Sequence, residues 1–464
     1  MAKMIIGLVH ENYVMNEQRD KFVGYEDVLQ LPLQPLGHTL PSGVYEVFEE
    51  DVAKYRLYYT AMCCYFKEWV QHRNVRSHER LCSIQASEAG SASGDKCAGT
   101  LYAVVLGAGR GPLVSECLCA ATGAGVRVNL FVVEKNPEAV KFLHLRRSID
   151  PQWREWINTC GHVLEVIHAD ARTLLPSNTS GSPDALPPNW GLCDLVVSEL
   201  LGSLGDNELS PECLDDFYKS LLCSQKALGI PPNPYLTSIP QQYTAWVAPL
   251  HSSRFEEAVA EAAIGGLTVP PPGCADPHAA LFHSTFVSNV CRAVSLCAPQ
   301  ECWTFHHFTE EGQPWDRDVT LKFPIPGKGR CSGFIGFFTA VLYSGSAQEI
   351  QIPVHTPQVS LSTMPQERTL DLFSWFPFLL PLAPRDIAEV VPGDEVQLHL
   401  QRCVDLKGAR VWYSYEATVL RQDGAASAGD RQVSIKINDG GWASSVSLCA
   451  KTDNLEDLGE DVLS

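Results

Sequence analysis

The sequence predicts a fold in two parts, an α/β part built on a parallel sheet and then an antiparallel β part. From residue 100, apolar runs such as LYAVVLG, VNLFVVEKN, HVLEVIHAD and CDLVVSE follow one another, with helical segments between the first of them. After the proline-rich stretch GIPPNPYLTSIPQQY, the runs become short and strand-like. The first rhythm indicates a parallel sheet with helices on both faces, and the second indicates an antiparallel sandwich or barrel.

Three regions are expected along the chain: residues 1–99, 100–237 and 238–464. The first is predicted to be largely helical, because VFEEDVAKYRLYYTAMCCYFKEWVQHR (47–73) has apolar and aromatic residues at helical spacing and neither proline nor glycine. We expect one long helix or two short ones there. The second region carries the parallel sheet and the third the antiparallel strands.

Composition excludes several classes of partner. A formal net charge of −19 over 464 residues disfavours direct nucleic-acid binding, because phosphate recognition needs a basic surface. No apolar run is long enough for a membrane span, and the N-terminus lacks the apolar core of a signal peptide. The 17 cysteines show neither a CxxC pair nor zinc spacing, so we expect reduced thiols and no metal. We therefore expect a cytoplasmic protein with access to the nucleus.

A glycine loop follows the first predicted strand. Gly107, Gly109 and Gly111 would let the backbone approach a nucleotide-like ligand at this turn. The dinucleotide pattern needs a glycine at position 112, where this sequence has proline, so a pyrophosphate and a nicotinamide-dependent oxidoreductase are disfavoured. No Gly-Lys-Ser/Thr follows, which excludes a phosphate-binding P-loop.

Two acidic residues end the next two predicted strands. Glu134 closes LFVVE and can accept hydrogen bonds from ribose hydroxyls. Asp170 in IHAD lies at the same carboxyl edge, where it could order the loop around an adenine or accept a hydrogen bond from the adenine amino group. Either acid alone could be an ordinary residue at the start of a helix or turn. A glycine loop with two strand-end acids favours S-adenosylmethionine as the cofactor.

The stretch SELLGSLGDNELSPE carries a second pair of acids. Glu199 follows the fourth predicted strand, and Glu208 lies nine residues later, with glycines at 202 and 205 between them. Two carboxylates brought together in this way can hold a planar cation. A helix start with Ser210 as N-cap would explain SPE, but it explains neither Glu199 nor the glycines.

Several motifs together resemble the type II, symmetric-dimethylating protein arginine methyltransferases. They are VLGAGRGPLV, VEKNPEAV and SELLGSLGDNELSPECLD, with LQPLGHTLPSGVYEVFEED (33–51) and DLFSWFPFLLP (371–381) in support. The resemblance runs from about residue 25 to past 415. It implies a Rossmann-type methyltransferase domain followed by a β-barrel domain. It also implies methyl transfer from S-adenosylmethionine to arginine in proteins such as histones and Gly/Arg-rich proteins, giving monomethyl and symmetric dimethylarginine.

The resemblance also implies three sets of site residues. The catalytic pair is Glu199 and Glu208. The cofactor-binding set is Tyr45, Lys54, Tyr55, Gly107, Gly109, Glu134, Asp170 and Ala171. The substrate-binding set, which lines the arginine channel, is Phe48, Ser374 and Trp375. The symmetric enzymes have phenylalanine and serine where the asymmetric ones have methionine and histidine, so Phe48 and Ser374 predict symmetric product.

The sequence departs from the resembled family in three ways. Fewer than 30 residues precede the matching region, so we do not expect the WD-repeat partner that docks on the large N-terminal barrel of the best-known members. Leu204-Gly205 replaces a more usual Phe-Ala. Insertions at 83–99, 176–191 and 358–370 contain no interpretable motif.

Arginine methyltransferases of this fold usually pair, so a homodimer is expected. The alternatives to an active enzyme on protein arginine are an inactive binding subunit and a methyltransferase acting on small molecules or RNA.

Overall fold

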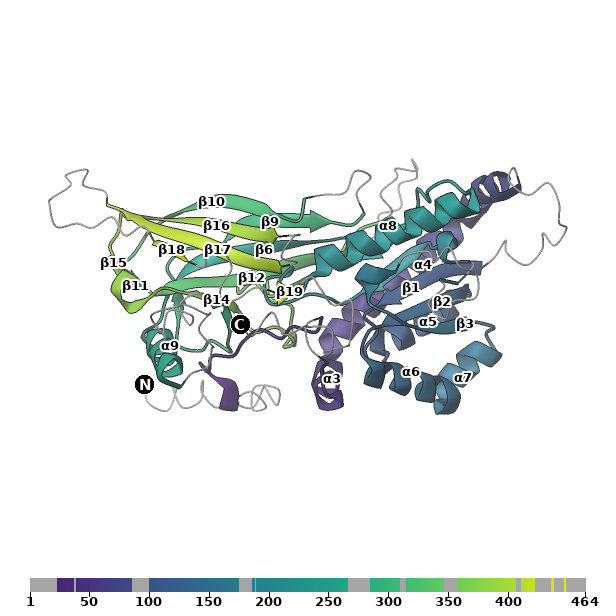
Figure 1. Ribbon diagram of the computed structural model, residues 1–464, viewed down its shortest axis with the longest axis horizontal. Helices are drawn as coiled ribbons and strands as arrows, with labels where there is room; N and C mark the ends of the chain where they lie inside the picture. Colours follow the sequence, from purple (N-terminus) through teal and green to yellow (C-terminus); the bar gives the residue numbers. More distant parts are fainter. Residues whose placement is uncertain are drawn as a thin grey trace, which may run out of the picture.

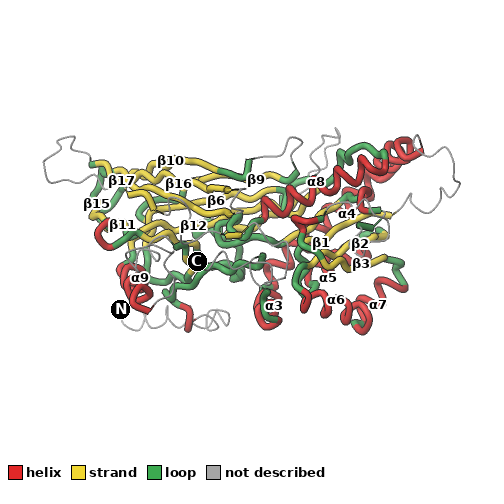
Figure 2. Tube along the Cα trace, in the orientation of Figure 1, coloured by secondary structure: helices red, strands yellow, loops and turns green. Residues whose placement is uncertain are grey.

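The computed structural model describes residues 23–36, 39–85, 100–174, 186–187, 189–265, 284–308, 314–345, 358–405, 410–421, 435–437 and 446–447. Its helices gather around a parallel sheet in one half, and antiparallel strands fill the other half (Figures 1 and 2). The two-part fold predicted from the sequence is therefore confirmed.

The α/β half contains a five-stranded parallel sheet in the order β3-β2-β1-β4-β5. Its strands are β1 (Thr100–Leu106), β2 (Arg127–Glu134), β3 (Val163–His168), β4 (Leu195–Ser198) and β5 (Thr237–Ile239). The helices after the strands are α5 (Pro112–Gly123), α6 (Pro137–Ile149), α7 (Pro151–Asn158) and α8 (Ser210–Leu228). Because β5 ends at Ile239, it straddles the boundary expected at residue 237.

Strand β1 shows why helices cover both faces of this sheet. All of its residues but Thr100 are buried, and successive side chains point to opposite faces. Leu101, Ala103 and Val105 pack in one apolar cluster with α5 residues, whereas Val104 and Leu106 pack in another with α8 residues. A continuous apolar run is therefore what a central strand in this position requires.

The described part of the N-terminal region is an arm followed by two helices. Residues 23–36 form an arm with only one short helical turn, η1 (Val23–Tyr25), and Gln30 bridges to Val287 in the antiparallel half. The helical part consists of the short helix α3 (Ser42–Glu49) and the 34-residue helix α4 (Val52–Gln85), rather than one long helix or two short ones. The chain breaks between them because the carboxylate of Asp51 accepts a hydrogen bond from the backbone N–H of Lys54, which caps α4.

The antiparallel half is built on two sheets. One has the order β7-β14-β12-β6-β8, with β13 paired to β12 and β9 to β6; the other has the order β10-β16-β17-β18, with β19 paired to β17. A two-stranded ribbon, β11-β15, completes it. The bounds are β6 (Gln242–His251), β7 (Phe286–Val287), β8 (Val294–Ser295), β9 (Gln300–His306), β10 (Arg317–Pro324), β11 (Gly329–Cys331), β12 (Gly333–Tyr343), β13 (Val359–Ser362), β14 (Phe378–Pro381), β15 (Ala388–Val390), β16 (Glu395–Asp405), β17 (Arg410–Leu420), β18 (Ile435–Ile437) and β19 (Val446–Ser447), with helix α9 (Ser253–Gly265) after β6.

These two sheets share one core. The rings of Phe323 on β10 and Phe334 on β12 lie 6.5 Å apart, and those of Phe378 on β14 and Tyr413 on β17 lie 5.6 Å apart. Strand β9 of the first sheet also contacts β10 of the second, which brings two sheet edges together. This arrangement agrees with the barrel-like domain that the resemblance implies.

The three insertions differ in how far they can be described. Residues 358–370 contain β13, which pairs with the long central strand β12. Helix α4 extends through Gln85, and the rest of the 83–99 stretch lies outside the described residues. Most of 176–191 also lies outside them. Within the described part of the chain, no helix is long and apolar enough to cross a membrane.

Candidate active site

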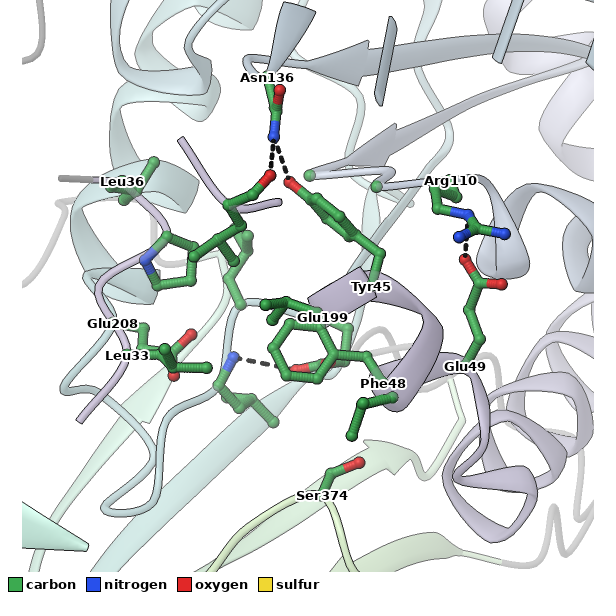
Figure 3. A pocket seen from close by; sticks show the side chains of 18 of the residues that line it. Leu33, Leu36, Tyr45, Phe48, Glu49, Arg110, Asn136, Glu199, Glu208 and Ser374 are labelled. Carbon is green, nitrogen blue, oxygen red and sulfur yellow. Dashed lines mark hydrogen bonds and ion pairs between the residues drawn. The ribbon is translucent and has the colours of Figure 1, made fainter. Parts of the chain in front are cut away.

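A cavity of about 650 Å³ opens at the carboxyl edge of the parallel sheet (Figure 3). It is lined mainly by the arm at residues 25–36, helix α3, the start of α4, the loops after β1, β2, β3 and β4, and residues 373–376 of the antiparallel half. Its size is in the range of small-molecule and cofactor sites. Strand ends in one half and a loop from the other thus enclose a single site, as expected where the carboxyl ends of parallel strands meet.

The glycine loop lies against Glu134 at the end of β2. The carboxylate accepts hydrogen bonds from the backbone N–H of Gly109 at 2.6 Å and of Asn136 at 2.7 Å. Gly109 has a left-handed backbone (φ +54°), and a Cβ there would lie 3.1 Å from the ring of Tyr45. Burial raises the pKa of Glu134. One acid therefore fixes the loop while its side chain lines the cavity.

Tyr45 on α3 forms the wall opposite the glycine loop. Its hydroxyl accepts a hydrogen bond at 3.1 Å from the side-chain amide of Asn136, which also donates to the carbonyl of Leu40 at 2.9 Å (Figure 3). Burial, followed by the charge of Glu134, raises the pKa of Tyr45 to about 12. The tyrosine thus stays neutral and is held over the loop, as its predicted role requires.

The two residues predicted to face an adenine lie differently. Ala171 lines the cavity. Asp170 does not line it, and its carboxylate accepts hydrogen bonds from the guanidinium of Arg172 at 2.8 and 3.0 Å. Burial raises the pKa of Asp170, but the bonds from Arg172 outweigh it and the pKa is lowered. In this structure Asp170 orders the turn after β3 rather than presenting oxygens to the cavity.

The loop between the two glutamates closes on itself through its glycines. Gly202 and Gly205 exchange backbone hydrogen bonds of 3.2 and 2.8 Å, and Gly205 has a left-handed backbone (φ +89°). Gly202 has no room for a Cβ, because the side-chain amide of Asn207 would lie 2.4 Å away. This tight turn brings both Glu199 and Glu208 to the cavity.

The interpretation of Ser210 as an N-cap is wrong. Ser210 is already the first helical residue of α8, and the N-cap position is held by Leu209 with φ 64° and no side-chain hydrogen bond. The alternative of an ordinary capped helix start therefore has no support in the loop's geometry.

The two pocket glutamates are not equivalent. Glu199 accepts a hydrogen bond at 2.9 Å from the ammonium of Lys54 and one at 3.3 Å from the backbone N–H of Leu201. Within the described chain, Glu208 has neither a hydrogen bond nor an ion pair. Burial, followed by the charge of Glu199, raises the pKa of Glu208 well above its usual value. One carboxylate is thus committed to a cation, and the other is open to a ligand.

Lys54 lies among three aromatic rings, of which Phe48 and Trp375 were predicted for the arginine channel and Tyr55 for the cofactor. Its ammonium is 4.8 Å from the ring centre of Tyr55, 5.3 Å from that of Trp375 and 5.7 Å from that of Phe48. Burial lowers the pKa of Lys54, but Glu199 more than reverses this and the pKa is raised, so the side chain is charged. The aromatic residues of the channel therefore already surround a cation, which shows that this environment suits one.

Sequence reasoning missed Asp51, which joins the two halves at the site. One of its oxygens accepts hydrogen bonds from the backbone N–H groups of Phe373 and Ser374 at 3.0 and 2.8 Å and from the Ser374 hydroxyl at 2.7 Å. The Trp375 indole donates to the carbonyl of Leu201 at 2.6 Å. These bonds hold the predicted substrate loop against α4 and the double-glutamate loop. The sequence feature that could have identified Asp51 is an acidic residue directly before the start of a helix, within the run EED.

A second missed cluster anchors the double-glutamate loop to the antiparallel half. The fully buried guanidinium of Arg402, on β16, pairs with Asp206 at 2.6 Å and Glu212 at 2.7 Å. Asp206 also accepts hydrogen bonds from the Tyr413 hydroxyl at 2.8 Å and the Trp303 indole at 3.2 Å. No motif could have identified Arg402, because it lies almost 200 residues from its partners.

No group of three or more His, Cys, Asp or Glu side chains suited to a metal ion occurs among the residues that the structure describes. The charged and aromatic side chains that gather at the cavity are instead carboxylates, aromatic rings, two lysines and one arginine. This donor set suits an organic cation.

Known proteins match both halves of the chain. A family profile described as PRMT5 arginine-N-methyltransferase matches residues 16–230, and one described as PRMT5 oligomerisation domain matches residues 242–440. Protein arginine N-methyltransferase 5 of Xenopus laevis is 34% identical over 397 residues, covering 85% of this chain and 50% of that protein. Protein arginine N-methyltransferase skb1 of Schizosaccharomyces pombe is 30% identical over 406 residues, covering 84% and 51%. The chain thus spans about half the length of these curated relatives.

A solved structure shares the fold at low sequence identity. It is the Trypanosoma brucei PRMT1 enzyme-prozyme heterotetrameric complex with AdoHcy, with TM-score 0.52, 13% identity and coverage of 86% of this chain and 98% of that one. The two profiles and the curated relatives identify the family: this chain belongs to the PRMT5 family of protein arginine N-methyltransferases.

Proposed function

We propose that this protein transfers methyl groups from S-adenosylmethionine to guanidinium nitrogens of arginine in proteins, giving monomethyl and symmetric dimethylarginine. The observation that carries the proposal is one cavity lined by the glycine loop, by Glu134 and by two carboxylates, of which Glu208 has no partner among the described residues. Membership of the PRMT5 family supports the same reaction.

The residues at the carboxyl edge fit the cofactor. A Cβ on Gly107 would lie 2.6 Å from Leu200, and one on Gly109 would lie 3.1 Å from Tyr45, so only glycine leaves this loop open to a close ligand. Glu134 lines the cavity at the end of β2, where a carboxylate can accept from ribose hydroxyls. When bound, the cofactor supplies an electrophilic methyl group on a sulfonium.

Two carboxylates are suited to the second reactant. A guanidinium stays protonated in proteins and is a poor nucleophile, because its lone pairs are delocalised. Glu199 and Glu208 would accept hydrogen bonds from the planar fork, which orients one terminal nitrogen and draws positive charge toward the others. Their charge also offsets the repulsion between the two cations. Orientation and prearranged charge then lower the barrier.

The unequal surroundings of the two glutamates suggest unequal roles. Lys54 holds Glu199 in place through an ion pair of 2.9 Å, so Glu199 acts mainly in orientation. Glu208 has a raised pKa, so it is the better acceptor for the proton that the guanidinium loses on methylation. The ammonium of Lys54 must share Glu199 with the guanidinium or move aside.

Product symmetry is proposed to depend on Phe48. The ring is edge-on to Tyr45 at 6.3 Å, and both lie on the short helix α3. A rigid ring would leave too little room for a methyl group on one side of the guanidinium, so a monomethylated arginine must present its bare nitrogen. Methionine at this position would bend away and relax that restriction.

The product test uses a Gly/Arg-rich peptide and methyl-labelled cofactor. Chromatography of the hydrolysed peptide should give monomethyl and symmetric dimethylarginine from the wild type, with asymmetric product appearing in Phe48→Met. Asymmetric product from the wild type would overturn the proposed role of the channel.

Histones and Gly/Arg-rich proteins are the proposed substrates, in the cytoplasm and nucleus. An acidic chain with net charge −19 would attract such basic segments. We also propose self-association, supported by the match of residues 242–440 to an oligomerisation domain. Size measurement of the purified chain in solution tests this last point, and a monomer at all concentrations would contradict it.

A further inference from the structure

Arg110, in the middle of the glycine loop, reaches out to helix α3. Its guanidinium lies 2.6 Å from a carboxylate oxygen of Glu46. It also lies 3.3 Å from a carboxylate oxygen of Glu49 (Figure 3). It also donates to the hydroxyl of Ser42 at 3.3 Å. One side chain thus contacts three residues of an eight-residue helix.

Arg110 is itself held firmly on the side of the parallel sheet. The guanidinium lies 4.4 Å above the ring of Phe142 on α6, and only 15% of the side chain is exposed. Arg146, also on α6, donates to the backbone carbonyl of Arg110 at 3.2 Å. A planar guanidinium stacked on a ring loses little further freedom when it binds carboxylates. Arg110 is therefore a rigid attachment point for α3 rather than a mobile surface side chain.

Helix α3 needs such an attachment to stay in place. It has only eight residues, none of them fully buried, so neither length nor core packing keeps it in place. Yet it carries Tyr45 toward the glycine loop and Phe48 toward Lys54. At its far end, Asp51 bonds the substrate loop, whereas Arg110 ties the body of the helix to the parallel sheet through two ion pairs.

We infer that Arg110 is a positioning residue. Its ion pairs with Glu46 and Glu49, here called the latch, hold α3 against the glycine loop and so position the cofactor wall and the arginine channel together. The inference rests on the proposed function for its effect on catalysis. Arg110 acts through α3. The glycines approach the cofactor and Tyr45 covers it, and Arg110 fixes the position of these two surfaces relative to each other. Loss of the latch should therefore raise cofactor KM more than it lowers kcat.

The test compares Arg110→Gln with the double variant Glu46→Gln/Glu49→Gln, which removes the same latch from the other side. Both should speed hydrogen exchange at the amides of α3 and weaken cofactor binding about three- to thirty-fold, the loss of charge-assisted hydrogen bonds. Combining all three changes should add little, because the partners share one interaction. Arg110→Lys should be intermediate, since it keeps the charge but not the fork.

Arg254 offers a matched control. It also pairs with two glutamates of its own helix α9, Glu257 at 3.3 Å and Glu261 at 3.5 Å, on the surface of the antiparallel half. Arg254→Gln should change neither α3 exchange nor cofactor affinity.

Two results would overturn the latch. Weakened cofactor binding in Arg110→Gln but not in Glu46→Gln/Glu49→Gln would mean that Arg110 contacts the ligand itself. Unchanged exchange of α3 in both would mean that the helix is held by other groups. Because exchange is measured on the protein alone, it decides the latch even if the wild type fails to bind the cofactor, a result that would count against the proposed function instead.

Discussion

The loop from Glu199 to Glu212 places four acids in two different surroundings. Asp206 and Glu212 point to the antiparallel half and enclose the buried guanidinium of Arg402, with Tyr413 and Trp303 also donating to Asp206. Glu199 and Glu208 point to the cavity, where Lys54 contacts only Glu199. Each pair has one cation, so charge alone does not distinguish them.

Hydrogen bonding distinguishes the two pairs. The inner pair, Asp206 and Glu212, is held by Arg402, and Asp206 accepts further hydrogen bonds from Tyr413 and Trp303, which fixes the loop in one position. In the outer pair, Glu199 and Glu208, the partly buried Glu208 has no donor in the described chain, and burial together with the charge of Glu199 raises its pKa. A site for a cationic substrate has to leave such an acid incomplete, so stability here is given up for binding. The inner pair keeps the outer pair in place.

The largest expected effect comes from breaking the inner pair. Arg402→Met should lower the free energy of unfolding by about 3–5 kcal/mol, because it leaves two buried acids without their cation. Urea or thermal denaturation measures this. The matched change Arg254→Met should leave the free energy of unfolding almost unchanged, because its ion pairs lie on the surface. A loss at Arg402 no greater than that at Arg254 would show that the inner pair is not an anchor.

Changing the outer pair should give the opposite result. Glu199→Gln and Glu208→Gln should each reduce methyl transfer at least about 100-fold, or by about 3 kcal/mol, because glutamine keeps the shape but loses the charged acceptor. Cofactor affinity should stay largely intact. Glu208→Gln should also unfold no more readily than the wild type, in contrast to Arg402→Met.

Glu134 combines the two situations, since it accepts backbone hydrogen bonds and also faces the cavity. Glu134→Ala should weaken S-adenosylmethionine binding by about 1–3 kcal/mol through loss of acceptors for ribose and loosening of the glycine loop. Calorimetry with the cofactor checks this, and NADH provides the control ligand, for which no binding is expected. Unchanged affinity for S-adenosylmethionine would remove Glu134 from the cofactor site.

The last prediction concerns pH. Because the pKa of Glu208 is raised by folding, the folded state holds its proton above the ordinary pKa of glutamate. Stability should therefore fall as pH rises from about 4.3 toward the raised pKa, by about 1.4 kcal/mol for each pH unit between the two pKa values, and then level off. Denaturation curves of the wild type minus those of Glu208→Gln isolate this contribution. A difference that does not change with pH would contradict the unpaired state of Glu208.

The sequence was sufficient for the parts of the site that follow from local chain chemistry. Strand ends, glycines and the acids beside them are contiguous in sequence, and parallel strands bring their carboxyl ends to one edge. Gly109, Glu134, Glu199 and Glu208 were therefore predictable, and all four line the cavity. The family resemblance added Tyr45, Phe48, Ser374 and Trp375, which line it too.

What the sequence could not predict depends on long-range pairing. Arg402 and Asp206 are 196 residues apart, and Asp51 and Ser374 are 323 apart, so no local pattern connects them. The same applies to Lys54, whose predicted role concerned the cofactor but whose ammonium contacts Glu199. The position of the Asp170 carboxylate could not be predicted either, because it depends on the ion pair with Arg172, a side chain that could equally have pointed to solvent.

The most direct test of the proposed mechanism is mass spectrometry of arginine products formed by the wild type and Glu208→Gln on the same Gly/Arg-rich peptide, with methyl-labelled S-adenosylmethionine. We predict labelled monomethyl and symmetric dimethylarginine from the wild type. We expect neither product above background from the variant, although the variant binds the cofactor and unfolds at no lower denaturant concentration. Near-normal product from Glu208→Gln would contradict the assignment of the open carboxylate as the group that receives arginine.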